Sequence, residues 1–293
     1  MSGGTFCISI DIEGAWGTWD QPDADDQRRC AQLEETIVGE LVSRLDQAEI
    51  AATWAIVGRL LERDDRAVRS TPFGERIWYA PGLIHAIRGA RTLQDIGSHG
   101  YSHRYFGRLS RDEARQELAR ARSVHDRHGL PFTSFVFPRN DVGHLGELQT
   151  AGVKIFRSGD HGWQTWVGHH LGRTAGRIAN LADKVLPVPP AVVRPVDHHG
   201  LAELPGSMIF LGRNGLRRAI HPRQTITKAR RGLEAARRAG ATFHMWFHPS
   251  NFYYRTDQQL ATLSAILATA VAMRKRGDIQ IWPMSRFVTV DPC

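Results

Sequence analysis

Two histidines spaced four residues apart are the strongest chemical signal in this sequence. His99 and His103 lie in the stretch IGSHGYSHR, directly after a short apolar approach. If the chain turns helical after Ser98, positions i and i+4 share a face, so both rings point the same way. Neutral imidazoles bind zinc, iron, cobalt and nickel ions. The spacing also arises by chance, so the pair alone leaves open whether it binds a metal.

Two acidic residues close the first apolar run of the chain. Asp11 and Glu13 stand in SIDIEG, separated by Ile12. Residues two apart on a strand point to the same face, so both carboxylates leave the sheet together. In a parallel barrel that carboxyl edge is where active sites lie. The alternative is a pair of solvated acids at a strand end.

A third histidine motif occurs late in the chain, in ATFHMWFHPSNF. His248 precedes Pro249, which forces a turn at the end of an apolar run. A histidine in that place can act as a general acid or base. His244 lies within the same run, where we expect a buried histidine whose hydrogen bonds are satisfied.

The elements that must position these residues follow from hydrophobic periodicity. Helix-period segments alternate with short β-rich runs, which favours a parallel α/β architecture and suits a barrel better than a small sandwich. Helices are predicted around Leu33 to Leu45, from the capping box at Ser110 to about His128, and over 256–275. The predicted strands are 5–10, 51–58, 95–99, 132–137, 153–158, 241–247 and 278–282.

The length of 293 residues allows one barrel or two smaller domains. We find no internal repeat or linker, so we predict a single barrel domain over 1–293. Two irregular stretches interrupt the rhythm, near 61–92 and 159–222, and long insertions of this kind are often functional loops.

Composition excludes several classes of protein. Hydrophobic residues make up 42% of the chain and charged residues 23%, which is ordinary for a folded globular protein. The net charge of +8 favours anionic partners. The densest basic run, within 228–238, has an Ala-rich helical pattern without a nucleic-acid motif, so we interpret it as a solvated helix face.

Cysteines and apolar stretches indicate the compartment. Three scattered cysteines form neither a disulfide framework nor a C-x-x-C zinc motif. The N-terminus lacks the pattern of a signal peptide, and no run reaches the roughly 18 apolar residues of a membrane span. We therefore expect a cytoplasmic protein that is not transmembrane.

Five motifs in order resemble the polysaccharide deacetylases of carbohydrate esterase family 4. They are SIDIEG, ATWAIVG, DIGSHGYSH, FVFPRN and FHMWFHPSNF, and together they span about residues 5–250. The resemblance implies a distorted (β/α) barrel with about seven parallel strands and one divalent metal ion. We expect zinc first, with iron, cobalt, nickel or manganese as alternatives.

The resemblance also assigns roles. It implies that His99 and His103 are metal ligands with Glu13 as the third, that Asp11 is the catalytic base, and that His248 is the general acid. The family usually has adjacent acids, so the base and ligand roles of Asp11 and Glu13 could be exchanged.

A second departure concerns the loop that carries FVFPRN. Arg139 stands where the family commonly has a tyrosine. Its guanidinium could orient Asp11 or bind an anionic substrate, and its backbone N–H could serve an oxyanion hole. Arg157 at the next strand end, Asn140 and Trp163 are the predicted substrate-binding residues.

The predicted activity is metal-assisted hydrolysis of an N-acetyl group on an amino sugar. In this mechanism Asp11 takes a proton from water and His248 protonates the leaving amine. A nucleotide- or lipid-linked intermediate of surface polysaccharide biosynthesis fits a basic cytoplasmic protein, and we expect no nucleic-acid partner. The alternatives are a deformylase or cyclic-amide hydrolase with the same metal site, or a non-catalytic saccharide-binding barrel.

Overall fold

Side chains of the first strand alternate between an apolar face and a face that carries polar groups. In the computed structural model, which describes residues 3–62, 77–160 and 188–288, strand β1 covers Gly4–Ile12. Its even-numbered side chains, Phe6 to Ile12, are buried in the largest apolar cluster, between the sheet and its helices. Its odd-numbered side chains, Cys7, Ser9 and Asp11, are buried on the other face. One face of the strand therefore supplies the core and the other supplies polar groups.

All strands of the described chain join one curled sheet of ten strands. Its order is β6-β7-β5-β4-β3-β2-β1-β9-β8, with β10 also paired to β1. Only β6 and β7 pair antiparallel. The other strands are β2 Thr53–Ile56, β3 Asp95–Ser98, β4 Ser134–Val136, β5 Ile155–Arg157, β6 Val196–Asp197, β7 Ala202–Glu203, β8 Met208–Ile209, β9 Thr242–Phe247 and β10 Ile279–Ile281.

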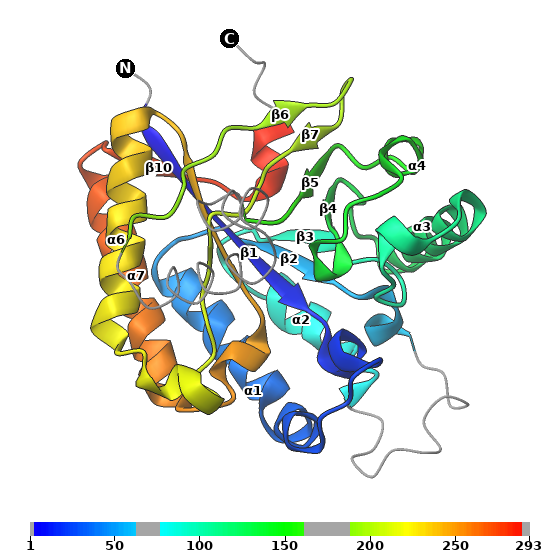
Figure 1. Cartoon of the computed structure of the whole chain (residues 1–293), viewed down its shortest axis with the longest axis horizontal. Helices are drawn as coiled ribbons and strands as arrows, with labels where there is room; N and C mark the ends of the chain where they lie inside the picture. The colour runs from blue at the N-terminus through cyan, green and yellow to red at the C-terminus, as the bar shows by residue number, and fades with distance from the viewer. Residues whose placement is uncertain (1–2, 63–76, 161–187, 289–293) are drawn as a thin grey trace, which may run out of the picture.

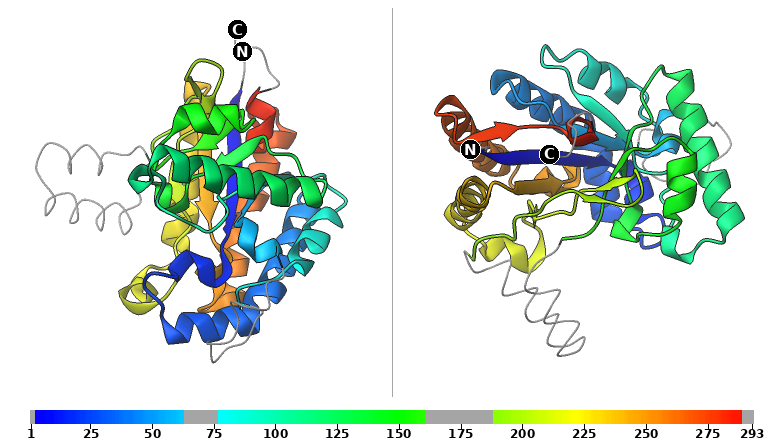
Figure 2. Two further views of the ribbon diagram at one scale, coloured as in Figure 1. Left: turned by 90° about the vertical axis from the view of Figure 1, so that its right-hand side faces the viewer. Right: turned by 90° about the horizontal axis from the view of Figure 1, so that it is seen from above.

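Helices surround the sheet, and β1 runs through the middle of the molecule (Figures 1 and 2). Helices α6 and α7 lie side by side next to β1 and β10, and α3 and α4 cover β4 and β5. The helices are α1 Ala24–Gln47, α2 Gly82–Arg88, α3 Arg111–Arg127, α4 Leu145–Thr150, α6 Pro222–Ala239 and α7 Thr256–Lys275.

The inner face of the sheet is unusually polar for a buried surface. Near the amino ends of the strands, the buried Asp95 carboxylate accepts hydrogen bonds from Thr53 Oγ1 at 2.8 Å and Ser134 Oγ at 2.9 Å. Higher up, Ser9 Oγ contacts His244 Nε2 at 2.9 Å, and His244 Nδ1 donates to the Pro205 carbonyl at 3.1 Å. Because these groups pair with one another, the interior can be polar without leaving them unsatisfied.

The predicted fold class, a distorted (β/α) barrel, is confirmed. All seven predicted strands are present and all pair in parallel, and the helices over 111–127 and 256–275 match their predicted bounds closely. The three two-residue strands β6 to β8, within 196–209, were not predicted, because a two-residue strand is too short to show a hydrophobic period. Both predicted insertions contain residues outside the described chain, at 63–76 and 161–187.

No helix in the described part of the chain has the length and apolar character needed to cross a membrane.

The start of α3 provides a test of local stability. Ser110 accepts from the Glu113 backbone N–H, and the Glu113 carboxylate accepts from the Ser110 N–H, which completes a capping box. We expect Ser110→Ala to lower the free energy of unfolding by about 1 kcal/mol, measured by urea denaturation. Gln116→Ala, on the exposed middle of the same helix, is the control and should change stability by less than about 0.5 kcal/mol. Equal effects of the two substitutions would contradict the capping role.

Candidate metal centre

The candidate site forms where parallel strands end. Glu13, His99 and His248 are each the first residue after a strand, following β1, β3 and β9. Asp11 is the second-last residue of β1, and Arg157 is the last residue of β5. Because parallel strands present their carboxyl ends at one edge, residues far apart in sequence converge there.

One carboxylate oxygen lies among three imidazoles. Glu13 Oε1 is 3.0 Å from Nε2 of His99, 3.0 Å from Nε2 of His103 and 3.2 Å from Nε2 of His248. Burial alone would raise the pKa of Glu13, but His248 and His103 lower it well below its usual value. The carboxylate is therefore ionised and faces three ring nitrogens at once.

The hydrogen bond made by His99 Nδ1 shows which ring nitrogen carries the proton, and hence what can lie between Nε2 and Glu13. Its Nδ1 lies 2.8 Å from the Val136 carbonyl oxygen, which can only accept, so Nδ1 carries the proton. In the neutral ring Nε2 is then a lone-pair acceptor, and it points at a second acceptor, Glu13 Oε1. Two acceptors 3.0 Å apart require a cation or an additional proton between them.

His103 has the same character. Burial lowers its pKa even though Glu13 opposes the shift, which favours the neutral, metal-binding form. Its buried Nδ1 finds no hydrogen-bond partner among the described residues. Its backbone adopts a left-handed φ of 57°, which brings the second imidazole next to the first without a helix.

The donor atoms suit a divalent ion. Glu13, His99 and His103 each offer one ligand atom within 4.8 Å of the others, and Asp11, Glu13 and His248 form a second such group. Donors about 2.0 to 2.2 Å from one ion lie about 2.8 to 3.6 Å from each other at coordination angles of about 90° to 109°. Two imidazoles and one carboxylate, with a coordination position left open, are typical of catalytic rather than structural zinc sites.

Asp11 occupies a different environment from Glu13. The buried Arg157 guanidinium donates to its two oxygens, at 2.8 Å and 2.6 Å, and also donates to Ser9 Oγ at 2.8 Å. The guanidinium also lies over the Trp246 ring, 4.3 Å from its centroid. Burial alone would raise the pKa of Asp11, but Arg157, together with His99 and His248, lowers it.

His248 faces both carboxylates. Its Nε2 is 3.6 Å from Asp11 Oδ2, and its backbone N–H donates to Asn251 Oδ1 at 2.8 Å. Burial alone would lower its pKa, but Glu13 and Asp11 raise it to about 9. The imidazole is therefore protonated at neutral pH, which is the state that a general acid needs.

Arg139 does not contact Asp11. Its Nη2 donates to the Gly17 carbonyl at 2.6 Å and to Asp20 Oδ1 at 3.0 Å. The sequence analysis allowed the Arg139 guanidinium either to orient Asp11 or to bind an anionic substrate. The first of these is wrong, because Arg157 occupies the position beside Asp11. Both Arg139 and Asn140 have positive φ, and Asn140 Oδ1 accepts from Arg157 at 3.3 Å.

These residues line a polar cavity of about 340 Å³. Asp11, Glu13, Arg139, Asn140, Arg157 and His248 reach it, together with Gly17, Thr18 and Trp246. His99 and His103 lie buried behind Glu13. Trp163, the remaining predicted substrate-binding residue, lies outside the described residues.

Gly17 and Trp246 are two of the cavity-lining residues that the sequence did not single out. A Cβ at Gly17 would lie 1.9 Å from Glu13 Oε2, so a side chain there would displace that carboxylate. Trp246 packs on Arg157 and donates from Nε1 to Asp160 Oδ1 at 2.6 Å. Trp246 could have been predicted, because it lies two residues before His248 and so shares its face at the end of β9. Nothing in the sequence indicated a role for Gly17.

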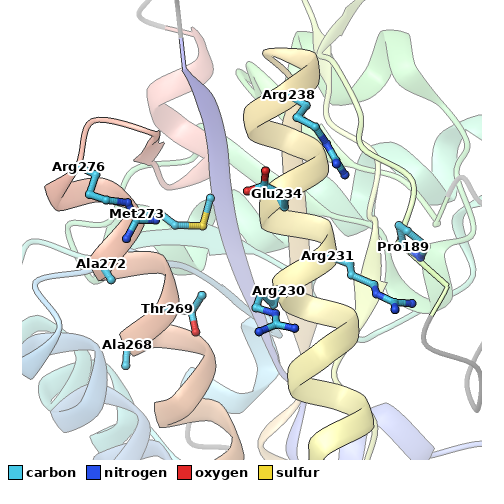
Figure 3. Close-up of a pocket in the computed structure, with 10 residues that line it drawn as sticks. All are labelled: Pro189, Arg230, Arg231, Glu234, Arg238, Ala268, Thr269, Ala272, Met273 and Arg276. Carbon is cyan, nitrogen blue, oxygen red and sulfur yellow. The ribbon is translucent and has the colours of Figure 1, made fainter.

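A second cavity, of about 860 Å³, lies along α6 and α7 (Figure 3). Its lining includes Arg230, Arg231, Arg238 and Arg276 but no histidine, and its one acid, Glu234, pairs with Arg237. This second cavity therefore lacks the cluster of histidines and carboxylates that metal binding and hydrolysis would need.

Comparisons with known proteins bear on the family and the fold. Residues 25–143 match the model of the polysaccharide deacetylase family. No curated protein sequence matches the chain. Among solved structures, a putative polysaccharide deacetylase from Mycobacterium smegmatis is similar, with a TM-score of 0.67 and 17% identity, covering 99% of this chain and 90% of the other.

Two further structures share the fold. The Xyl-CE4 domain of a multidomain xylanase from the hindgut metagenome of Trinervitermes trinervoides gives a TM-score of 0.50 at 12% identity, covering 98% of this chain and 90% of the other. A GH57 branching enzyme from Thermococcus kodakaraensis gives 0.61 at 11% identity, covering 100% and 72%. Likeness at these identities shows the fold, so the chemistry must be argued from the site.

Gly17 provides a matched test of the metal centre. We expect Gly17→Ala to displace the Glu13 carboxylate and to weaken zinc binding at least about tenfold, measured by competition with a chelating dye. Gly39→Ala, in α1 with nothing within 4 Å of the added Cβ, is the control and should bind zinc like the wild type. Thermal melts of both variants exclude unfolding as the cause. Equal zinc affinities would contradict the role of Gly17.

Proposed function

We propose that this chain is a divergent member of the polysaccharide deacetylase family, and that it is a metal-dependent hydrolase that removes an N-acetyl group from an amino sugar. The observation that carries the proposal is the acceptor pair formed by His99 Nε2 and Glu13 Oε1, which requires a cation or an additional proton and which we assign to a divalent cation. The acetylated sugar would be part of a saccharide, or linked to a nucleotide or lipid carrier, in surface polysaccharide biosynthesis.

We assign the ion to Glu13, His99 and His103. A divalent ion, with zinc expected first, would act as a Lewis acid that polarises the amide carbonyl and acidifies water. The same donors also accept iron, cobalt, nickel or manganese. Asp11 is excluded from this set in our proposal because Arg157 already binds both of its oxygens.

The two remaining site residues divide the proton transfers. Asp11 stays ionised beside Arg157, and we assign it as the base that takes a proton from the attacking water. His248 starts protonated and gives its proton to the nitrogen as the C–N bond breaks, so the products are acetate and a free amine. The 3.6 Å between His248 Nε2 and Asp11 Oδ2 allows the proton to return to His248 afterwards.

Arg139 and Asn140 keep supporting roles in the proposal. Both line the cavity, and Asn140 supports the Arg157 guanidinium that orients Asp11. The backbone N–H of Arg139 stays a predicted oxyanion donor. Arg157 is buried and donates to both oxygens of Asp11, so we assign it to the orientation of Asp11 rather than to substrate binding. The fold alone would not decide this chemistry, since a glycan branching enzyme shares it.

Substitution of the two acids separates base from ligand. We expect Asp11→Asn to lower acetate release by at least about 10²-fold while zinc stays bound, and Glu13→Gln to lose zinc as well as activity. Acetate is measured with a panel of N-acetylated saccharides and nucleotide-linked sugars, and zinc by elemental analysis. Loss of zinc from Asp11→Asn with zinc retained in Glu13→Gln would reverse the assignment. Formate from N-formyl substrates, or saccharide binding without turnover, would support the alternative functions.

The pH profile tests the general acid. Since the carboxylates raise the pKa of His248 to about 9, its acid form is present below that pH and is lost as pH rises through it. An ion bound to Glu13 offsets part of that attraction, so kcat/KM should fall on the alkaline side at or below pH 9. His248→Gln should lower kcat/KM by about 10²- to 10⁴-fold and remove this alkaline limb. An unchanged limb in the variant would show that another group titrates.

A further inference from the structure

We propose that Glu117 is a positioning residue for the metal centre, because its carboxylate holds the loop that carries His103. This inference rests on the proposed function. Glu117 lies in α3, is only 4% exposed and is not among the residues that line the cavity at the strand ends. Its role is therefore to act through the loop and not to touch the substrate.

The two histidines that we assign as ligands are held in different ways. His99 directly follows β3, its backbone N–H donates to the Ile56 carbonyl at 2.9 Å, and its Nδ1 donates to the Val136 carbonyl at 2.8 Å. His103 lies in a segment without helix or strand, and its buried Nδ1 has no hydrogen-bond partner within the described ranges. Metal-binding histidines usually fix their ring through the second nitrogen. Because His103 lacks such a contact, the place of its ring depends on the backbone of the loop.

Glu117 supplies the acceptors that this loop lacks. In a helix the N–H groups of Tyr101 and Ser102 would donate to carbonyls four residues earlier, but Gly100, with φ of 74°, turns the chain away from a helix. Both N–H groups donate instead to Glu117 Oε1, at 3.1 Å and 2.5 Å. Ser102 Oγ lies 3.0 Å from each oxygen of the same carboxylate. The carboxylate thus binds the two residues that immediately precede His103.

The charge of Glu117 is explained by the loop and not by the packing of α3. Within the part of the chain that the structure describes, every hydrogen bond of this carboxylate goes to Tyr101 or Ser102, and no lysine or arginine forms an ion pair with it. Burying a carboxylate is costly unless N–H and O–H groups replace the water that it loses. Ala114 and Ala121, which lie about one turn before and after it on the buried side of α3, are apolar. An apolar residue would therefore serve the packing of α3 better.

The carbonyl groups of the same loop are held by a different element, η2 Gly58–Leu61. The Gly58 N–H donates to the Gly100 carbonyl at 2.9 Å, and the Arg59 N–H donates to the Tyr101 carbonyl at 2.8 Å. Without Glu117 these contacts remain, but the N–H groups just before the second histidine lose their acceptor. We therefore expect the fold to persist while the two imidazoles lose their fixed separation.

The competing explanation is that Glu117 only stabilises the folded chain. In that case its removal would lower the free energy of unfolding and leave the zinc affinity of the folded protein unchanged. Asp46 in α1 is a matched control, because its carboxylate also accepts from two consecutive backbone N–H groups, those of Arg91 and Thr92, at 2.9 Å and 2.7 Å. That turn carries none of the residues that we assign as ligands.

The test measures the zinc affinity of the full chain by competition with a chelating dye, with thermal melts of the metal-free variants alongside. Glu117→Ala should bind zinc about 10- to 100-fold more weakly than the wild type. Glu117→Gln keeps a carbonyl oxygen that can accept from both N–H groups, so it should retain most of the affinity. Asp46→Ala should lower the melting temperature and bind zinc like the wild type.

Three results would overturn the role of Glu117 while the metal centre stands. They are a zinc affinity of Glu117→Ala equal to that of the wild type, a Glu117→Gln variant as weak as Glu117→Ala, and an equal loss of affinity in Asp46→Ala. If Glu117→Ala does not fold, Glu117→Asp takes its place, because the shorter side chain withdraws the acceptor from the loop and should also weaken zinc binding. Unchanged affinity in that variant overturns the inference. A wild type that binds no zinc overturns the proposed function itself, and this inference with it.

Discussion

The contact on which the site depends is that of one carboxylate oxygen with three imidazoles. Glu13 Oε1 lies within 3.2 Å of Nε2 of His99, His103 and His248. Because His99 commits its other nitrogen to the Val136 carbonyl, the arrangement cannot be a set of ordinary neutral hydrogen bonds. The proposed cation between Glu13, His99 and His103 would satisfy the facing acceptors, while protonated His248 can donate to Glu13 Oε1 directly. The glycine at position 17 leaves room for the Glu13 carboxylate beside these rings.

The sheet separates the two acids chemically, although they are two residues apart. Asp11 still belongs to the inner face of β1, where Arg157 and Ser9 form a buried polar network with His244. Glu13 lies one residue past the strand end and turns toward the imidazoles. Arg157 lowers the pKa of Asp11, whereas the imidazoles of His248 and His103 lower the pKa of Glu13. This separation supports the proposed roles of Asp11 as the base and Glu13 as the metal ligand.

Much of the fold and part of the site could be predicted from the sequence. Short β-rich runs located all seven strands that have three or more residues. The spacing of Asp11 and Glu13 placed both acids at the carboxyl edge of the sheet. Two features could not be foreseen. The first is that Arg157, and not Arg139, lies beside Asp11. This depends on the register of β5 and on the positive φ of Arg139, which no local sequence pattern encodes. The second is the role of Gly17, which depends on the contact between Gly17 and the Glu13 carboxylate. This contact exists only in the folded chain.

The most direct test of the account is anomalous diffraction at the zinc edge from crystals grown with zinc. The account predicts one peak about 2.0 to 2.2 Å from Nε2 of His99, from Nε2 of His103 and from a carboxylate oxygen of Glu13. It also predicts that Asp11 stays bound to Arg157 and outside the coordination sphere. A peak coordinated by Asp11 instead of Glu13, or no peak between the two histidines, would contradict it.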